Sequence, residues 1–160
     1  MPVENRRRSL WFKVSLSIGV LLAGVVLGAY LFRDTQPRSF LAIDQCQSNC
    51  LSRKELLGLL GSVGVQKAGW TIPNVVLETP LNVAITHPLP TAPIHYVIIP
   101  KKDIRNIGEL SPEDQTYVMD AYAVAQQLIE QDKLEKYKFS TLGPGWQDVA
   151  YLHFHLTAEK

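Results

Sequence analysis

The feature that most constrains this chain is an uncharged apolar run from Val14 to Phe32. A run of this length can cross the hydrocarbon core of a bilayer as one helix. Aromatic residues, which favour the membrane interface, lie near its two ends at Trp11, Phe12 and Tyr30. The run predicts a transmembrane helix over residues 14–32, and the rest of the 160-residue chain suffices for one compact domain.

Basic residues precede the apolar run, at Arg6, Arg7, Arg8 and Lys13. A basic start is also typical of a cleaved signal peptide. The apolar run is longer than a usual signal sequence, however, and no clear small-residue cleavage site precedes Arg33, so the sequence favours an uncleaved anchor. Because positive charge favours the cytoplasmic side, we expect residues 1–13 in the cytoplasm and the C-terminal domain outside it, as a single-pass membrane protein.

The formal charge of the chain is only +1. No large basic field is therefore available, and nucleic acid is not an expected partner. Residues 33–50 are expected to form a linker, which carries Cys46 and Cys50. In an oxidising compartment these two cysteines would form a short-loop disulfide, although their spacing is tight for a helix. Zinc is the rival interpretation, but it would need ligands from elsewhere in the chain.

Apolar, β-branched runs broken by prolines predict strands over residues 75–79, 81–86, 94–99 and 137–141. Ser52 and Glu55 have the spacing of a capping box and predict a short helix over residues 52–60. Ser111, followed by a proline and two acids, predicts the start of a helix that continues to about Lys133. The inward stripe of that helix is expected to be Tyr117, Ala121, Val124, Leu128 and Ile129.

The stretch Val149–Leu156 near the end of the chain is predicted to be a strand. Side chains alternate across a strand, so Tyr151, His153 and His155 would share one face while apolar residues line the other. Two histidines in this arrangement can hold a metal. Alternatively, one imidazole can act as a nucleophile while its neighbour handles protons. The spacing alone leaves both interpretations open.

Two segments, in this order along the chain, carry a family resemblance. The first is Pro93–Lys101, with the sequence Pro-Ile-His-Tyr-Val-Ile-Ile-Pro-Lys, and the second is Gln147–Leu156, after a helix opened by Ser-Pro-Glu-Asp. Together they resemble the histidine-triad (HIT) family of nucleotide-binding hydrolases and transferases, over about residues 75–156. The resemblance implies an α+β fold, in which an antiparallel sheet of about five strands is covered by a long helix, in a domain over residues 51–160.

The resemblance also implies roles for individual residues. In the family, the middle histidine of the motif His-φ-His-φ-His-φ-φ attacks the α-phosphate of a nucleotide and forms a nucleotidyl-histidine. Here that nucleophile is His153, with His155 and His95, when protonated, as donors that meet the phosphate charge. Tyr151 stands at the first triad position, where a phenol can still donate or accept one hydrogen bond. Gln147 is expected to bond the phosphate or the leaving group.

Two further residues are candidates for substrate binding. His87 occupies the position at which the family usually has an aspartate that holds the ribose hydroxyls, and Ser140 lies on the predicted strand before the Gly-rich turn. No cofactor and no bound metal are expected. Because family members are commonly dimers, a homodimer is one expected assembly, and subunits of a larger membrane complex are another.

Three functions stay open from the sequence. The first is a membrane-anchored nucleotide or phosphoester hydrolase, or a nucleotidyl transferase, that uses His153. Its substrate would be a nucleotide or a nucleotide-linked lipid pyrophosphate, since the related CDP-diacylglycerol pyrophosphatases share an N-terminal anchor and an external domain. The second is a non-catalytic binding or accessory subunit, suggested by Tyr151, His87 and Asp148. The third is a metal site, which needs three imidazoles within about 2.1 Å of one point. We expect the enzyme, because the nucleophile position is intact.

Overall fold

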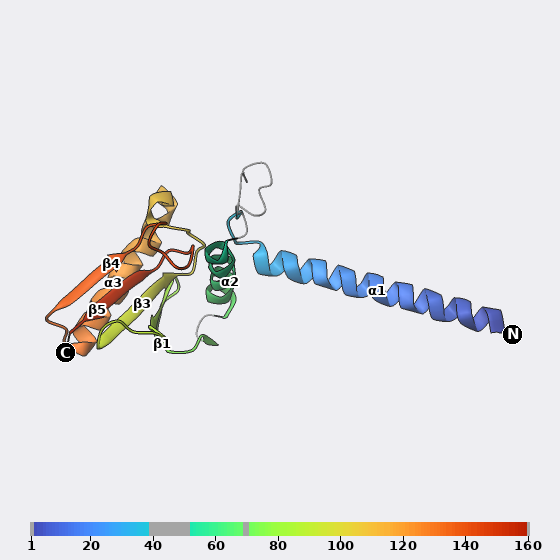
Figure 1. Ribbon diagram of the computed structural model, residues 1–160, viewed down its shortest axis with the longest axis horizontal. Coiled ribbons are helices and arrows are strands. Elements are labelled where there is room, and N and C mark those ends of the chain that lie inside the picture. The colour runs from blue at the N-terminus through green and yellow to red at the C-terminus, as the bar shows by residue number, and fades with distance from the viewer. Residues whose placement is uncertain (1, 39–51, 69–70, 160) are drawn as a thin grey trace. The chain divides into compact units, whose positions relative to one another are not determined.

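The computed structural model describes residues 2–38, 52–68 and 71–159, so the predicted pair Cys46 and Cys50 lies outside the described residues. The chain divides into two units, residues 1–33 and 34–160. The first unit contains helix α1 (Pro2–Phe32), drawn in blue in Figure 1. Its segment Trp11–Phe32 has a mean hydropathy of 2.2 and is long and apolar enough to cross a membrane, a property that a signal sequence shares.

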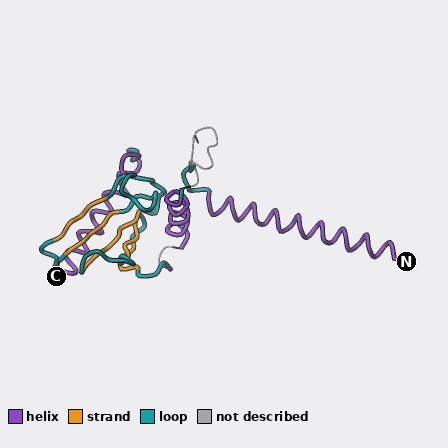
Figure 2. Tube along the Cα trace, in the orientation of Figure 1, coloured by secondary structure: helices purple, strands orange, loops and turns teal. Residues whose placement is uncertain are grey.

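The second unit is built on a five-stranded sheet with the order β1-β2-β3-β5-β4, in which every neighbouring pair is antiparallel. The strands, orange in Figure 2, are β1 (Val75–Glu78), β2 (Asn82–Thr86), β3 (Ile94–Pro100), β4 (Tyr137–Thr141) and β5 (Phe154–Ala158). The first four strands lie where the sequence predicts them. The predicted α+β fold with an antiparallel sheet is confirmed.

Helix α3 (Gln115–Asp132) covers one face of the sheet (Figure 1). It follows two short 3-10 turns, η2 (Ile107–Glu109) and η3 (Pro112–Asp114). Ser111, the predicted N-cap, forms a capping box, because the Ser111 N–H donates to the Asp114 carboxylate over 2.7 Å. The residues of α3 that pack on the sheet are Ala121, Val124, Ala125 and Leu128. They meet Ile98, Phe154 and Leu156 in the main core, against which Ile129 also packs. The predicted stripe is thus found except for Tyr117, which is half-buried outside this cluster.

The last strand begins later than the sequence predicts. Strand β5 starts at Phe154, whereas the predicted strand started at Val149. The backbone of the preceding segment is bonded elsewhere: the Tyr151 N–H donates to the Val149 carbonyl over 2.8 Å, and the Leu152 N–H donates to the Ile104 carbonyl over 2.6 Å. These amides are not available to a neighbouring strand, so Tyr151 and His153 lie in the turn that leads into β5.

Helix α2 (Arg53–Ala68) is longer than predicted. Its start is as expected, with the Glu55 N–H donating to Ser52 Oγ over 3.2 Å. Gly58, Gly61 and Gly64 lie inside the helix. One of them has a packing reason: a Cβ added at Gly58 would lie 2.4 Å from the Ala150 carbonyl oxygen. Gly58 therefore lets α2 approach the turn that carries Tyr151 and His153.

This contact predicts opposite effects at two glycines of the same helix. We expect Gly58→Ala to lower the free energy of unfolding by about 1–2 kcal/mol, because overpacking exceeds the gain in helix propensity. Gly64 has no atom within 4 Å of its added Cβ. We expect Gly64→Ala to raise the free energy of unfolding by up to about 1 kcal/mol. Thermal unfolding of both variants measures this, and a shift in the same direction for both would contradict it.

Candidate functional site

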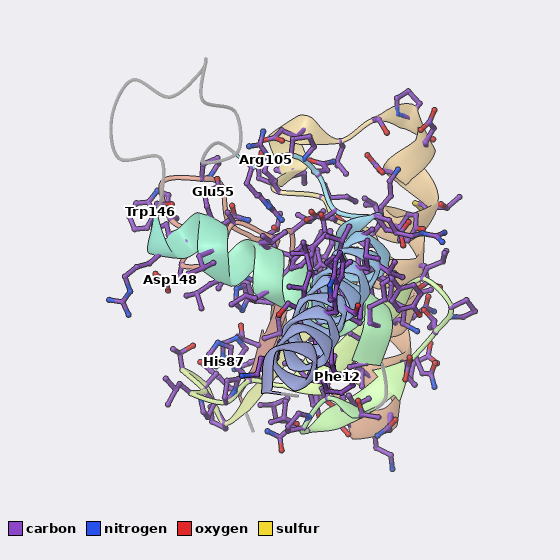
Figure 3. The ribbon with its side chains drawn as sticks, turned by 90° about the vertical axis from the view of Figure 1, so that its right-hand side faces the viewer. Phe12, Glu55, His87, Arg105, Trp146 and Asp148 are labelled. Carbon is purple, nitrogen blue, oxygen red and sulfur yellow. The ribbon has the colours of Figure 1, made fainter. Side chains whose placement is uncertain are left out.

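A cavity of about 590 Å³ lies on the face of the sheet opposite α3. The strand register explains why histidines meet there. His155 on β5 lies between Val97 of β3 and Ser140 of β4, and His95 of β3 lies opposite Thr157, so these side chains project from the same face. The cavity is lined by His87, Leu89, Thr91, His95, Lys138, Ser140, Leu142, Asp148, Val149, His153, His155 and Thr157. Figure 3 labels His87 and Asp148.

The hydrogen bond of His153 fixes its tautomer. Its Nδ1 lies 2.7 Å from the carbonyl oxygen of Tyr151, which can only accept, so Nδ1 carries the proton. In the neutral ring this leaves the lone pair on Nε2. An imidazole held in this tautomer can attack an electrophile through Nε2 without first losing a proton. Because the Tyr151 carbonyl holds Nδ1, the position of that carbonyl also determines where the Nε2 lone pair points.

A chain of hydrogen bonds fixes the tautomers of His95 and His155. The Thr91 N–H donates to His95 Nδ1 over 3.2 Å, so the proton of neutral His95 is on Nε2. That Nε2 donates to His155 Nδ1 over 2.9 Å, so the proton of neutral His155 is on its own Nε2. His155 Nε2 is buried without a hydrogen-bond partner among the described residues. The series of hydrogen bonds from Thr91 through His95 thus ends in a free donor, the Nε2–H of His155. This donor lies next to His153, whose ring centroid is 4.8 Å from that of His155.

His87, the fourth histidine of the cavity, stacks on the ring of His95. The rings of His87 and His95 are nearly parallel, with an interplanar angle of 12° and centroids 4.2 Å apart. Ligand nitrogens of His87, His95 and His155 lie within 4.8 Å of one another. These three residues could hold a metal only after rearrangement, because in-plane lone pairs on two parallel stacked rings do not converge. The hydrogen bond between His95 and His155 also occupies two of the nitrogens.

Burial keeps three of the imidazoles neutral at pH 7. Desolvation lowers the pKa of His95, with the nearby His87 acting in the same direction. Desolvation also lowers the pKa of His153, an effect that the bond to the Tyr151 carbonyl and the charge of Asp148 partly oppose. The pKa of His155 falls to about 4, through desolvation first and then through the neighbouring histidines. The site is therefore ready for nucleophilic attack at neutral pH.

The pH dependence of any reaction at His153 follows from these shifts. Protonation of His153 would remove the lone pair on Nε2, so activity falls as the pH decreases. Because the pKa values of His153 and His155 lie below the ordinary 6.5, kcat/KM should stay level near neutral pH and fall only in more acidic solution. The pH profile of kcat/KM with a nucleoside 5′-phosphate derivative measures this. An acid limb centred at or above 6.5 would contradict it.

The structure brings together four of the predicted histidines and Ser140 but not Tyr151 or Gln147. Tyr151 is 3% exposed and packs with Val83 and Val65 in a separate core cluster. Its phenol donates to the Pro100 carbonyl, and burial raises its pKa. It therefore lies behind the site rather than in it.

Gln147 lies in a different place. It is 3% exposed, and its amide donates to the Arg105 carbonyl over 3.4 Å. It lines a smaller cavity of about 170 Å³ together with Glu55 and Arg105, which Figure 3 labels. The reason is the turn, in which the Gln147 N–H and the Trp146 N–H both donate to the Gly143 carbonyl. Gln147 thus does not line the cavity of the histidines.

Some residues that line the cavity could not be predicted from the sequence as site residues. Thr91 contributes through its backbone N–H, which every residue type except proline offers. Lys138 reaches the cavity because it pairs with Thr157 on the same face of the sheet. Only the register between β4 and β5 could identify it, and that register depends on the late start of β5.

A family model described as the HIT domain matches residues 72–160. The chain belongs to the HIT domain family. An uncharacterized HIT-like protein of Synechococcus elongatus is 33% identical over 86 residues, which cover 52% of this chain and 75% of that protein. The match to a bifunctional adenosine 5′-phosphosulfate phosphorylase/adenylylsulfatase of Arabidopsis thaliana is 33% identical over 72 residues, 43% of this chain and about half (49%) of that protein.

Solved structures agree with this family. A HIT family hydrolase from Clostridium thermocellum is 27% identical, with a TM-score of 0.54 over 59% of this chain and 85% of that chain. A HIT family hydrolase from Legionella pneumophila is 30% identical, with a TM-score of 0.53 over 58% of this chain and 88% of that chain. The fold of this HIT domain is therefore that of HIT family hydrolases.

Proposed function

We propose that this HIT domain is a nucleotidyl hydrolase or transferase in which His153 is the nucleophile. The observation that carries the proposal is the hydrogen bond from His153 Nδ1 to the Tyr151 carbonyl, which leaves the Nε2 lone pair available in an open cavity. A cavity filled by an aromatic side chain would have favoured a non-catalytic role. Instead Tyr151 is buried behind the site, and Trp146 is 81% exposed and does not line the cavity.

The chemistry proceeds in two displacements. His153 Nε2 attacks the α-phosphorus of a nucleotide, a P–N bond forms, and the bond to the leaving group breaks with both electrons on that group. The leaving group takes a proton from solvent, to which the cavity is open. The positive charge on the ring of His153 is met by the Tyr151 carbonyl at Nδ1. Water, or another acceptor, then attacks phosphorus, and the P–N bond breaks with both electrons on Nε2, so that His153 returns to its neutral form. The proton of the attacking group passes to solvent.

The donors around His153 support this chemistry. His155 Nε2–H has no partner among the described residues and is available to a phosphoryl oxygen. Ser140 lies opposite His155 on the neighbouring strand, and Lys138 lies further along the same face. Leu89, Leu142 and Val149 give the cavity an apolar wall that suits a base or sugar. A volume of about 590 Å³ suits a ligand of nucleotide size.

The proposed substrates are nucleoside 5′-phosphate derivatives with a good leaving group. The name of the Arabidopsis relative makes adenosine 5′-phosphosulfate one candidate. A nucleotide-linked lipid pyrophosphate is a second, since residues 14–32 are proposed to anchor the chain in a membrane with residues 1–13 in the cytoplasm and the HIT domain outside. The two assemblies expected from the sequence, a homodimer and a larger membrane complex, stay predictions.

The test uses the full chain purified in detergent. It is incubated with adenosine 5′-phosphoramidate, adenosine 5′-phosphosulfate, a dinucleoside polyphosphate and a CDP-linked lipid, and the released nucleoside monophosphate is measured. Turnover of at least one substrate by protein free of contaminating hydrolase is the expected result. The four substrates differ in their leaving groups, so the substrate that is turned over fastest identifies the leaving group that the protein prefers. Turnover of none would contradict the proposal.

A second function is favoured by one observation. Asp148 lines the cavity and is exposed, and its negative charge opposes a phosphate ligand. A non-catalytic binding or accessory subunit would explain an acid at this place. Saturable binding of nucleotides or stable co-purification with membrane proteins, without any turnover, would select this alternative.

A further inference from the structure

Arg38 precedes the HIT domain in sequence but is completely buried, with an exposed fraction of 0%. Its Nη2 donates to Asp103 Oδ1 over 2.6 Å, and Asp103 is itself 1% exposed. The Gln36 N–H donates to the other carboxylate oxygen over 2.8 Å. Burial of a charged guanidinium requires partners of this kind. Gln36 and Arg38, near the start of the second unit, are therefore fixed to Asp103 of the same unit by hydrogen bonds and a buried ion pair.

The same guanidinium has a second acceptor. Arg38 Nη1 donates to the Ala150 carbonyl over 3.1 Å, and Glu55 of α2 lies 3.8 Å away. The planar fork of arginine lets one side chain serve Asp103 and Ala150 at the same time, which a lysine ammonium on a flexible stem does not reproduce. Arg38, which lies in the segment after α1, thus contacts both α2, through Glu55, and the turn before β5, through Ala150.

Ala150 belongs to the turn that orients His153. Its own N–H donates to the Lys54 carbonyl over 3.0 Å, and its carbonyl is the atom against which Gly58 packs. The next residue is Tyr151, whose phenol is bonded to the Pro100 carbonyl and whose backbone carbonyl accepts from His153 Nδ1. Arg38 holds the peptide immediately before the one that fixes the tautomer of His153.

We propose that Arg38 is a positioning residue for the nucleophile, because its bond to the Ala150 carbonyl holds the turn whose Tyr151 carbonyl orients His153. Arg38 does not line the cavity. The segment between the apolar helix and the HIT domain is then part of the catalytic apparatus rather than a passive tether. This inference rests on the proposed function for its effect on turnover, but the orientation of His153 can be tested without any substrate.

The test compares the full-length wild type with Arg38→Lys and with Lys67→Ala. Arg38→Lys keeps a positive charge beside Asp103 but loses the second arm of the fork. Lys67→Ala removes an exposed ion pair, 2.9 Å to Asp34, that joins the same segment to α2 without contacting Ala150. We expect Arg38→Lys to lower kcat about tenfold with KM changed less than about twofold, and Lys67→Ala to match the wild type.

Histidine ¹⁵N NMR provides the readout that is independent of turnover. The wild type should show His153 as the Nδ1–H tautomer, and Arg38→Lys should show a mixture of tautomers. If Arg38→Lys has a lower Tm but an unchanged kcat and a pure Nδ1–H tautomer, Arg38 is structural and the inference is wrong. If the wild type turns over no substrate, the proposed function fails, while the NMR comparison still decides the role of Arg38.

Discussion

Replacing His153 with alanine is expected to lower kcat by about a thousandfold or more, because the variant has no group that can form the P–N bond. The Nε2 lone pair of His153 is the proposed nucleophile, and among the described residues that line the cavity no other side chain is held in the same way by a backbone carbonyl. Substrate binding should persist, since the cavity keeps His155, Ser140 and Lys138. The measurement is kcat and KM on the fastest substrate.

The matched control for this variant is Trp146→Ala. Trp146 lies in the turn before β5, is exposed and does not line the cavity, so its removal should leave kcat within about twofold. Circular dichroism and Tm of both variants establish that they are folded. Residual activity of the His153 variant above about a tenth of the wild-type value would show that another group carries the reaction.

Replacing His155 with alanine is expected to lower kcat by about a hundredfold, because it removes the donor next to the reacting phosphorus. The Nε2–H of His155 is the end of the chain from the Thr91 N–H through His95. His155→Gln keeps an N–H donor of similar reach and should lose less activity than the alanine variant. The measurement is kcat for both variants, with their Tm as the control of folding.

Two results would argue against the role of His155. Wild-type kcat in the alanine variant would show that no donor is needed at this position. Equal losses in the alanine and glutamine variants would show that hydrogen-bond donation is not what His155 supplies. In that case its imidazole would matter for shape or for the orientation of His153, whose ring lies against it.

The sequence predicted most of the sheet and the main helix because their signals are local. Prolines bound the β-branched runs that form β1 to β3, and each proline removes an amide that a strand would use. The Ser111 cap combines a side-chain acceptor with acids at the positive end of the helix dipole. Such signals do not depend on the rest of the chain.

The late start of β5 depends on distant partners instead. The alternation of Tyr151 and His153 fits a strand, but the Leu152 amide is taken by Ile104, and the Tyr151 phenol is taken by Pro100. No local pattern contains these bonds. The predicted helix over residues 52–60 is too short for the same reason, because Gly58 allows the close contact of α2 with Ala150, which lies far away in the sequence.

The candidate site was predicted from the family resemblance, which the segments Pro93–Lys101 and Gln147–Leu156 carry and which implies roles for His95, His153 and His155. Residue type alone left metal binding and nucleophilic chemistry both open. Gln147 was assigned to the phosphate, but its amide is taken by the Arg105 carbonyl. Arg38 gave no signal, because its partners Asp103 and Ala150 are far away in the sequence.

The covalent intermediate tests the central claim most directly. The wild-type chain is mixed with its fastest substrate, quenched in alkali within the first turnovers, and examined by intact-protein and peptide mass spectrometry. The predicted result is one nucleoside monophosphoryl group, stable in alkali and labile in acid, on the peptide that contains His153, and none in the His153→Ala variant. Turnover with no adduct, or an adduct on a different residue, would contradict the assignment of His153 as the nucleophile.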